Sequence, residues 1–134
     1  MPASSAFAYC HGLTSVTIPD SVTTLGSSAF YNCPITKATI PTIAISYIKN
    51  SNLKEVVITS GENIPVSAFS SCGKLTSVVI CDCITSIGEN AFGYCYDLVN
   101  ISIPDSVTYI GDGAFHGSDN LAYNEYDNAY YLGS

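Results

Sequence analysis

The sequence has no arginine and no tryptophan, and its four lysines stand against eleven acidic residues, which gives a net charge of −7. Binding to nucleic acid depends on clustered positive charge that displaces counterions, so this composition excludes a nucleic-acid-binding protein. No apolar run approaches the roughly 18 to 20 residues that span a bilayer, which argues against insertion into a membrane. Charged residues make up only 11% of the chain and hydrophobic residues 47%, the opposite of a disordered composition. The 134 residues therefore predict one compact domain.

Groups that carry catalysis are equally scarce. The chain has two histidines, and neither a G-x-S-x-G elbow nor a C-x-x-C motif occurs in it. A serine or cysteine nucleophile needs an adjacent base, and the sequence offers no such constellation. We therefore expect no enzyme, with no catalytic residue, no cofactor and no metal site.

The first residues, Met-Pro-Ala-Ser-Ser-Ala-Phe, contain no basic segment followed by an apolar stretch, so they do not predict a signal peptide. They enter at once into a pattern that recurs along the whole sequence. We therefore expect this chain to be a fragment of a longer protein.

An internal repeat dominates the sequence. Every phenylalanine directly follows an alanine, at Phe7, Phe30, Phe69, Phe92 and Phe115. The third residue after the phenylalanine is Cys10, Cys33, Cys72 and Cys95 in the first four copies and Ser118 in the last. A fixed period of roughly 20 to 30 residues indicates a solenoid of stacked short units.

The leading aliphatic residue of each unit marks the unit boundaries. These residues are Leu13, Ile35, Leu53, Leu75, Leu98 and Leu121. The unit that begins at Ile35 is shorter than the others and lacks the Ala-Phe pair. We expect a single solenoid over residues 1–134 that continues through this degenerate unit with a shortened convex side.

Alternating apolar and polar residues predict one strand in each unit. In the first full unit, this alternation directs Val16 and Ile18 inward and Ser15 and Thr17 outward. A proline then ends the strand because it cannot donate a ladder hydrogen bond, at Pro19, Pro41 and Pro104. The aliphatic pair that follows the proline is expected to turn back into the core.

Small residues shape the other side of each unit. Glycine permits backbone conformations that are closed to other residues, which suits a tight corner at Gly26, Gly88 and Gly111. Residues 27–33 then predict a short helical turn that carries Ala29, Phe30 and Cys33 inward.

The pattern A-F-x-x-C-x-x-L-x-x-V-x-I-P-x-S-V-x-x-I-G recurs from Ala6 to Leu121 and resembles the BspA-like leucine-rich repeats of surface proteins from bacteria and some protists. The resemblance implies an α/β repeat solenoid, a leucine-rich-repeat arc with a parallel β-sheet on the concave side and short turns or helical turns on the convex side. It also implies adhesion or recognition at an extracellular or cell-surface location. The short unit departs from the pattern, as does Cys81-Asp82-Cys83, which replaces Pro-Asp-Ser.

The six cysteines fall into two groups. The four at the repeat position should form a column of buried free thiols, because stacked side chains point the same way rather than toward one another. Cys81 and Cys83 could instead form a disulfide bond or bind a soft metal. Two cysteine ligands without a nearby histidine make a poor metal site. The sequence alone does not choose between them.

Three aspartates recur two residues after the last isoleucine of a strand, at Asp20, Asp82 and Asp105. At this turn position a side chain can cap backbone amides, and a calcium ladder is the alternative. The glycosylation sequon Asn100-Ile101-Ser102 falls in a predicted strand rather than in a loop.

Binding is expected on the concave face, because stacked repeats build an extended surface there. Its outward residues are Ser15, Thr17, Lys37, Thr39, Glu55, Val57, Ser77, Val79, Asn100 and Ser102. This face is hydroxyl-rich and almost uncharged, although serine, threonine and valine also occur in strands that bind nothing. We predict a non-catalytic module that binds a protein or glycan partner through this surface.

The two ends of the solenoid favour an alternative, a structural building block that self-associates. The first strand has an open edge, and Val16 and Ile18 keep one flank without a neighbouring repeat. The far end is rich in tyrosine, which forms either a contact patch or a cover over the last core layer, at Tyr123, Tyr126, Tyr130 and Tyr131. Contacts through these ends would give a homo-oligomer or a filament.

Overall fold

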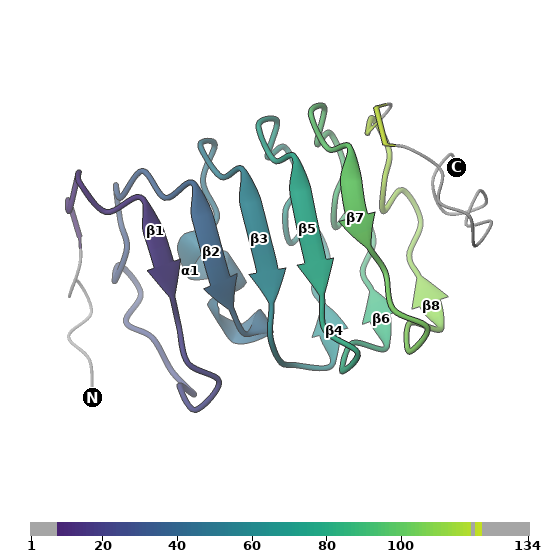
Figure 1. Ribbon diagram of the computed structural model, residues 1–134, viewed down its shortest axis with the longest axis horizontal. Coiled ribbons are helices and arrows are strands. Elements are labelled where there is room, and N and C mark those ends of the chain that lie inside the picture. Colours follow the sequence, from purple (N-terminus) through teal and green to yellow (C-terminus); the bar gives the residue numbers. More distant parts are fainter. Residues whose placement is uncertain (1–7, 119, 122–134) are drawn as a thin grey trace.

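The computed structural model describes residues 8–118, 120 and 121 of the chain. The chain winds into a solenoid whose successive turns each add one strand to a parallel sheet of five (Figure 1). From one edge to the other, the strands are β1 (Ser15–Thr17), β2 (Lys37–Ile40), β3 (Glu55–Ile58), β5 (Ser77–Ile80) and β7 (Asn100–Ser102). The predicted strands and their parallel pairing are confirmed.

The inward side of this sheet forms one wall of the hydrophobic core. The register places Ile40, Ile58 and Ile80 opposite one another on neighbouring strands, and none of them is more than 3% exposed. A single unit could not bury this row, but each neighbour covers the next, so the core runs continuously through the stack.

A second parallel sheet lies further along each turn and consists of three short strands. These are β4 (Asn63–Ile64), β6 (Ser86–Ile87) and β8 (Tyr109–Ile110). The sequence predicted only an aliphatic pair that turns into the core here, because two-residue strands are too short to show an alternating pattern. The ladder continues past these strands, since the N–H of Gly88 donates to the Ile64 carbonyl and that of Gly111 donates to the Ile87 carbonyl, both at 2.8 Å.

The Ala-Phe segments form turns, and the helical turn predicted for residues 27–33 is wrong. The residue two positions after the phenylalanine has a positive φ in all five copies, at Tyr9, Asn32, Ser71, Tyr94 and Gly117. The residue two positions before it also has a positive φ in three copies, at Ser67, Asn90 and Gly113. A left-handed residue cannot continue a right-handed helix, so the described Ala-Phe segments form turns instead.

In these turns, alternate N–H groups point at the next unit. Around Phe69, the donors Ser67, Phe69 and Ser71 bond to the carbonyl oxygens of Glu89, Ala91 and Gly93 at 2.8, 2.7 and 2.8 Å. The same three positions around Phe92 donate to the unit that follows. Hydrogen bonds to the next unit therefore alternate with bonds inside the segment, in which the N–H groups of Ala68, Ser70 and Cys72 donate to carbonyls three residues earlier.

Two of the recurring corner glycines, Gly88 and Gly111, serve close packing rather than an unusual backbone conformation. The glycines with positive φ in the described chain are Gly61, Gly113 and Gly117, so the predicted role of Gly26, Gly88 and Gly111 is wrong. A Cβ atom on Gly88 would lie 2.6 Å from the Val66 nitrogen, and one on Gly111 would lie 2.5 Å from the Glu89 nitrogen. Only glycine lets the backbones of neighbouring units approach this closely.

The phenylalanines form a stacked column inside the solenoid. The ring centroids of Phe69 and Phe92 are 5.4 Å apart with an interplanar angle of 14°, and those of Phe92 and Phe115 are 5.4 Å apart at 5°. Phe92 lies in the middle of this column and is fully buried. The predicted phenylalanine column is confirmed.

The degenerate unit fills its place in the column with a helix. A 3-10 helix, η1 (Thr42–Ala44), leads into α1 (Ile45–Ile48), and both Ile45 and Ile48 are buried. Figure 1 shows α1 behind the five-strand sheet, and β2 of the same unit pairs with β1 and β3, so the solenoid continues through this unit as predicted. Within residues 8–118, 120 and 121, no helix is long and apolar enough to cross a membrane.

Candidate binding surface

The outward side of the five-strand sheet collects all ten residues predicted for the binding face into two rows. The register aligns Ser15, Lys37, Glu55, Ser77 and Asn100 in one row and Thr17, Thr39, Val57, Val79 and Ser102 in the other. Each of these side chains is exposed or half-buried. Because parallel strands lie about 4.8 Å apart, each row presents its five side chains over roughly 19 Å.

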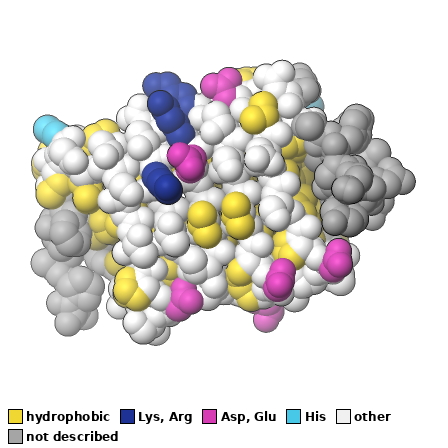
Figure 2. Space-filling model, in the orientation of Figure 1, with side chains coloured by type: hydrophobic (Ala, Val, Ile, Leu, Met, Phe, Trp, Pro, Cys, Tyr) yellow, Lys and Arg dark blue, Asp and Glu magenta, His cyan; other side chains and the backbone are white. Residues whose placement is uncertain are grey.

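This five-strand face is mostly uncharged, with an apolar centre. Val57 is half-buried and its register partner Val79 is 45% exposed, so two valines lie together at the middle of the sheet. Beside them, Lys37 and Glu55 are register partners on β2 and β3. Figure 2 shows a small hydrophobic area near the centre of this face, among side chains that are mostly neutral and polar.

Charged residues gather at the two borders of the five-strand face. Lys54 directly precedes β3, whereas Asp20, Asp82 and Asp105 follow the strands of their units. Figure 2 shows lysines at the upper border and centre and acidic side chains mostly along the lower border. The two valines thus lie next to one lysine and one glutamate, while most other charges of this face lie at its borders.

The predicted turn position of the aspartates is confirmed. Asp20 lies in the turn that the Val22 N–H closes on the Pro19 carbonyl at 3.1 Å, and its carboxylate accepts a hydrogen bond from the Thr59 hydroxyl. Among the described residues, no group of three or more His, Cys, Asp or Glu side chains could hold a metal ion. The sequon Asn100-Ile101-Ser102 lies in strand β7 as expected.

The N-terminal edge of the sheet differs partly from its prediction. β1 is the outermost strand, and Val16 is half-buried as expected for an end unit. Ile18 is only 6% exposed and its side chain joins the core cluster, so it offers little surface to the predicted end contact. Its N–H donates to the Thr39 carbonyl of the following unit at 2.9 Å. The tyrosines predicted for the other end, Tyr123, Tyr126, Tyr130 and Tyr131, lie outside the described residues.

The repeat cysteines are buried in three of their four positions. Cys33, Cys72 and Cys95 are buried thiols outside the disulfide, as predicted, whereas Cys10 is exposed. Burial raises the pKa of Cys95 to about 12, with a further increase from neighbouring Cys72, and burial also raises the pKa of Cys72. Cys72 and Cys95 therefore stay protonated near neutral pH, and they pack rather than react.

The repeat cysteine also has a hydrogen-bonding role that the sequence analysis missed. The Cys95 thiol donates to the Phe69 carbonyl at 3.2 Å, and the Ser118 hydroxyl donates to the Phe92 carbonyl at 2.8 Å. Both bonds join the side chain to the phenylalanine of the preceding unit. The signal was present in the sequence, because serine replaces cysteine in the last copy and shares with it a side-chain donor.

Stability above pH 9 should depend on Cys95. The pKa of its thiol rises from 9.0 to about 12 on folding, so between these values the unfolded chain loses a proton that the folded chain keeps. The free energy of unfolding should therefore fall by about 1.4 kcal/mol per pH unit in this window, with no contribution below pH 9. Cys95→Ser keeps a donor and removes the titration, so denaturant unfolding of this variant should show a shallower pH dependence than the wild type. Equal slopes would contradict this assignment.

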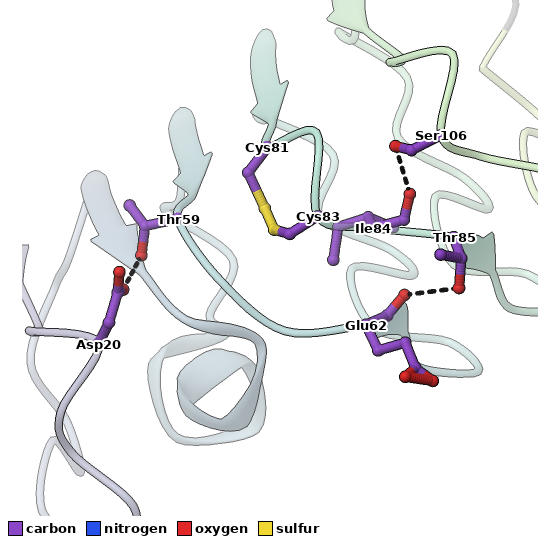
Figure 3. The surroundings of a disulfide bond; sticks show 8 residues. All are labelled: Asp20, Thr59, Glu62, Cys81, Cys83, Ile84, Thr85 and Ser106. Atoms are coloured by element: carbon purple, nitrogen blue, oxygen red, sulfur yellow. Dashed lines mark hydrogen bonds between the residues drawn. A yellow bond between two sulfur atoms is a disulfide. The ribbon is translucent and has the colours of Figure 1, made fainter.

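Cys81 and Cys83 form a disulfide in the turn after β5 (Figure 3). Their Cα atoms are 5.2 Å apart, and the Ile84 N–H closes the turn on the Cys81 carbonyl at 3.2 Å. In the corresponding Pro-Asp-Ser turn, the Val107 N–H donates to the Pro104 carbonyl at the same distance of 3.2 Å. The turn at Pro104 forms without a disulfide, so this turn type does not require one. Of the alternatives that the sequence left open for Cys81 and Cys83, the structure shows the disulfide.

Thiol labelling should distinguish the two groups of cysteines. Iodoacetamide added to the unreduced, denatured chain is expected to modify four cysteines, because four are free in the structure. After reduction it should modify all six. Intact mass spectrometry counts the labels in each sample, and six labels before reduction would show that Cys81 and Cys83 are not bonded.

Comparison with known proteins shows that this chain is similar to leucine-rich repeat proteins. The sequence matches the family model of the BspA type leucine rich repeat region over residues 3–61 and 62–131, with six copies. The structure is similar to a leucine-rich repeat protein of Bacteroides ovatus, with a TM-score of 0.61 and 32% identity over 82% of this chain and 36% of that one. It is also similar to a leucine rich cell surface protein of Faecalibacterium prausnitzii, with a TM-score of 0.54 and 33% identity over 81% of this chain and 28% of that one. The chain therefore spans only about a third of the length of these two proteins. No curated protein matches the sequence.

Proposed function

Because the chain belongs to the BspA type leucine-rich repeat family, we propose that it is a non-catalytic module of a secreted or cell-surface protein and binds a protein partner through its five-strand face. Leucine-rich repeat proteins are generally protein-interaction modules, and one structural relative is described as a cell surface protein. The disulfide between Cys81 and Cys83 supports an oxidising location, since disulfides persist mainly outside the cytosol.

The observation that carries this proposal is the alignment of outward side chains in two rows. Val57 and Val79 supply an apolar centre that is already partly desolvated, and hydroxyl groups surround it. Binding energy usually concentrates in such a central area, while the polar rim excludes water. A rigid sheet also presents these side chains without a large loss of conformational entropy on binding.

The test places a charge at the centre of the face. Val79→Glu should weaken binding of the chain to whichever member of a panel of purified extracellular-matrix proteins it binds, measured by biolayer interferometry, by about tenfold or more. Val66→Glu is the matched control, because Val66 is 64% exposed and lies outside the five-strand face. If Val79→Glu binds as tightly as the wild type, or if both variants lose affinity equally, the five-strand face is not the binding surface.

Self-association through the edge of β1 is the second candidate, and it rests on the place of β1 at the end of the sheet. On its outer side, β1 has no strand neighbour among the residues that the structure describes, and an unpaired strand edge can pair with another chain. Sedimentation at up to about 100 μM should then reveal dimers or longer species. Thr17→Lys should abolish them, whereas Thr39→Lys, which puts the same charge on the inner strand β2, should not. A monomer at all concentrations would rule this candidate out.

A further inference from the structure

The degenerate unit opens a cavity in the side of the solenoid that lies behind the five-strand sheet. Where two Ala-Phe turns adjoin, backbone hydrogen bonds such as Phe92 N–H to Ala114 carbonyl, at 2.7 Å, close the space between them. Between the first full unit and the degenerate unit, α1 takes the place of an Ala-Phe turn. A cavity of about 460 Å³ lies there, between residues 27–34 on one side and residues 46–52 on the other.

The lining of this cavity combines aromatic rings with neutral polar groups. The two tyrosines Tyr31 and Tyr47 come from opposite sides, and the amides Asn32 and Asn52 do likewise. Lys49 also lines the cavity, but its ammonium donates to the Ser67 carbonyl and the Ser70 hydroxyl, at 3.0 and 3.1 Å, outside the cavity. None of the described residues around the cavity is acidic, so its lining offers neutral polar groups and favours a hydroxylated ligand over a cation.

Hydrogen bonds hold the floor and the polar rim in place. The Asn50 amide donates to the carbonyl oxygens of Ile35 and Ile48 at 3.1 and 3.0 Å, and its oxygen accepts from the Asn52 N–H at 2.7 Å. The Lys74 ammonium donates to the Asn52 side-chain oxygen at 3.4 Å. A site whose groups are held before the ligand arrives loses less entropy on binding.

Tyr31 forms a partly fixed aromatic wall. Its ring meets that of Tyr9 edge to face, with centroids 5.6 Å apart and an interplanar angle of 81°. At the same time the residue remains 55% exposed and lines the cavity. A supported yet accessible ring can pack against the apolar face of a ligand.

We infer that this cavity, lined by Tyr31, Tyr47, Asn32 and Asn52, is a saccharide-binding site. A pyranose has an apolar ring face that packs on tyrosine and a rim of hydroxyl groups that side-chain amides can hydrogen-bond. The volume of about 460 Å³ lies within the range of small-ligand pockets. This site is separate from the five-strand face, so it does not depend on the proposed protein-binding function.

The test is an NMR titration of the isotope-labelled chain with methyl glucoside, N-acetylglucosamine and sodium glucuronate. At sugar concentrations up to about 50 mM, at least one of them should cause saturable shifts at the side-chain amides of Asn32 and Asn52 and at Tyr31. Tyr31→Ala should weaken this binding by about fivefold or more, because it removes the stacking ring. Tyr96→Ala is the matched control, since Tyr96 is similarly exposed, at 58%, and does not line the cavity.

A second variant removes a polar group without disturbing the fold. Asn32 has φ of 58°, a conformation that suits glycine, so Asn32→Gly should fold normally and still bind the sugar more weakly. Three results would each overturn the inference: no saturable shift with any of the sugars, equal affinities in the wild type and both cavity variants, or the same shifts at lower concentrations of inorganic phosphate, which would make this an anion site.

Discussion

Replacing Phe92 by alanine is expected to lower the free energy of unfolding by about 3 to 5 kcal/mol. Phe92 is fully buried and stacks at 5.4 Å on both Phe69 and Phe115, so its removal opens a cavity within the column. The backbone around it cannot collapse easily, because the N–H of Phe92 is bonded to the Ala114 carbonyl of the next unit. Denaturant unfolding of the wild type and the variant measures the difference.

The control for this prediction is an aromatic residue at the surface. Tyr96 is 58% exposed, so Tyr96→Ala should change stability far less than Phe92→Ala. Phe92→Leu should fall between the two, because leucine fills part of the cavity. A Phe92→Ala variant as stable as the wild type would show that the stacked column does not support the fold.

Gly88→Ala should lower the free energy of unfolding by about 2 to 3 kcal/mol, although it adds only one methyl group. The new Cβ atom would lie 2.6 Å from the Val66 nitrogen and 2.8 Å from the Pro65 carbonyl carbon. Both contacts are with backbone, which cannot rotate away as a side chain can. The units must therefore move apart, which strains the hydrogen bond from Gly88 N–H to the Ile64 carbonyl at 2.8 Å.

Gly12 provides the matched control for this substitution. A Cβ atom on Gly12 meets nothing within 4 Å, so Gly12→Ala should be neutral or slightly stabilising. Thermal or denaturant unfolding measures the stability of both variants. The difference between them separates the steric clash at Gly88 from the general effect of replacing glycine by alanine. If both variants were equally stable, the close approach of neighbouring units at Gly88 would not be a constraint on the fold.

Regular repeats and the break in them have different consequences for function. The regular units build the five-strand face, where Val57 and Val79 lie in register at the centre. The degenerate unit interrupts the column and opens the cavity beside α1. The five-strand face depends on the regular repeat, whereas the cavity depends on the break in it. The two sites can therefore be tested independently, by Val79→Glu and by Asn32→Gly.

The sequence by itself determined the solenoid, its parallel sheet and the direction of most side chains. The sequence is periodic, because the Ala-Phe pair and the Val-x-Ile segment recur at the same positions of successive repeats. A stack of similar turns buries these apolar residues together. The same periodicity predicted the Phe69–Phe92–Phe115 column and the two outward rows, because residues at one repeat position must lie side by side.

Only the tertiary structure decided how neighbouring units meet. The left-handed residues at Ser71 and Tyr94 are not glycine, so their conformation follows from the bonds that their N–H groups make to the next unit. The role of Gly88 likewise depends on the backbone of Val66, which lies in a different unit. The helix α1, the disulfide in the turn after β5 and the cavity beside Tyr31 all occur where the repeat is broken, and there the pattern no longer specifies which side chains come together.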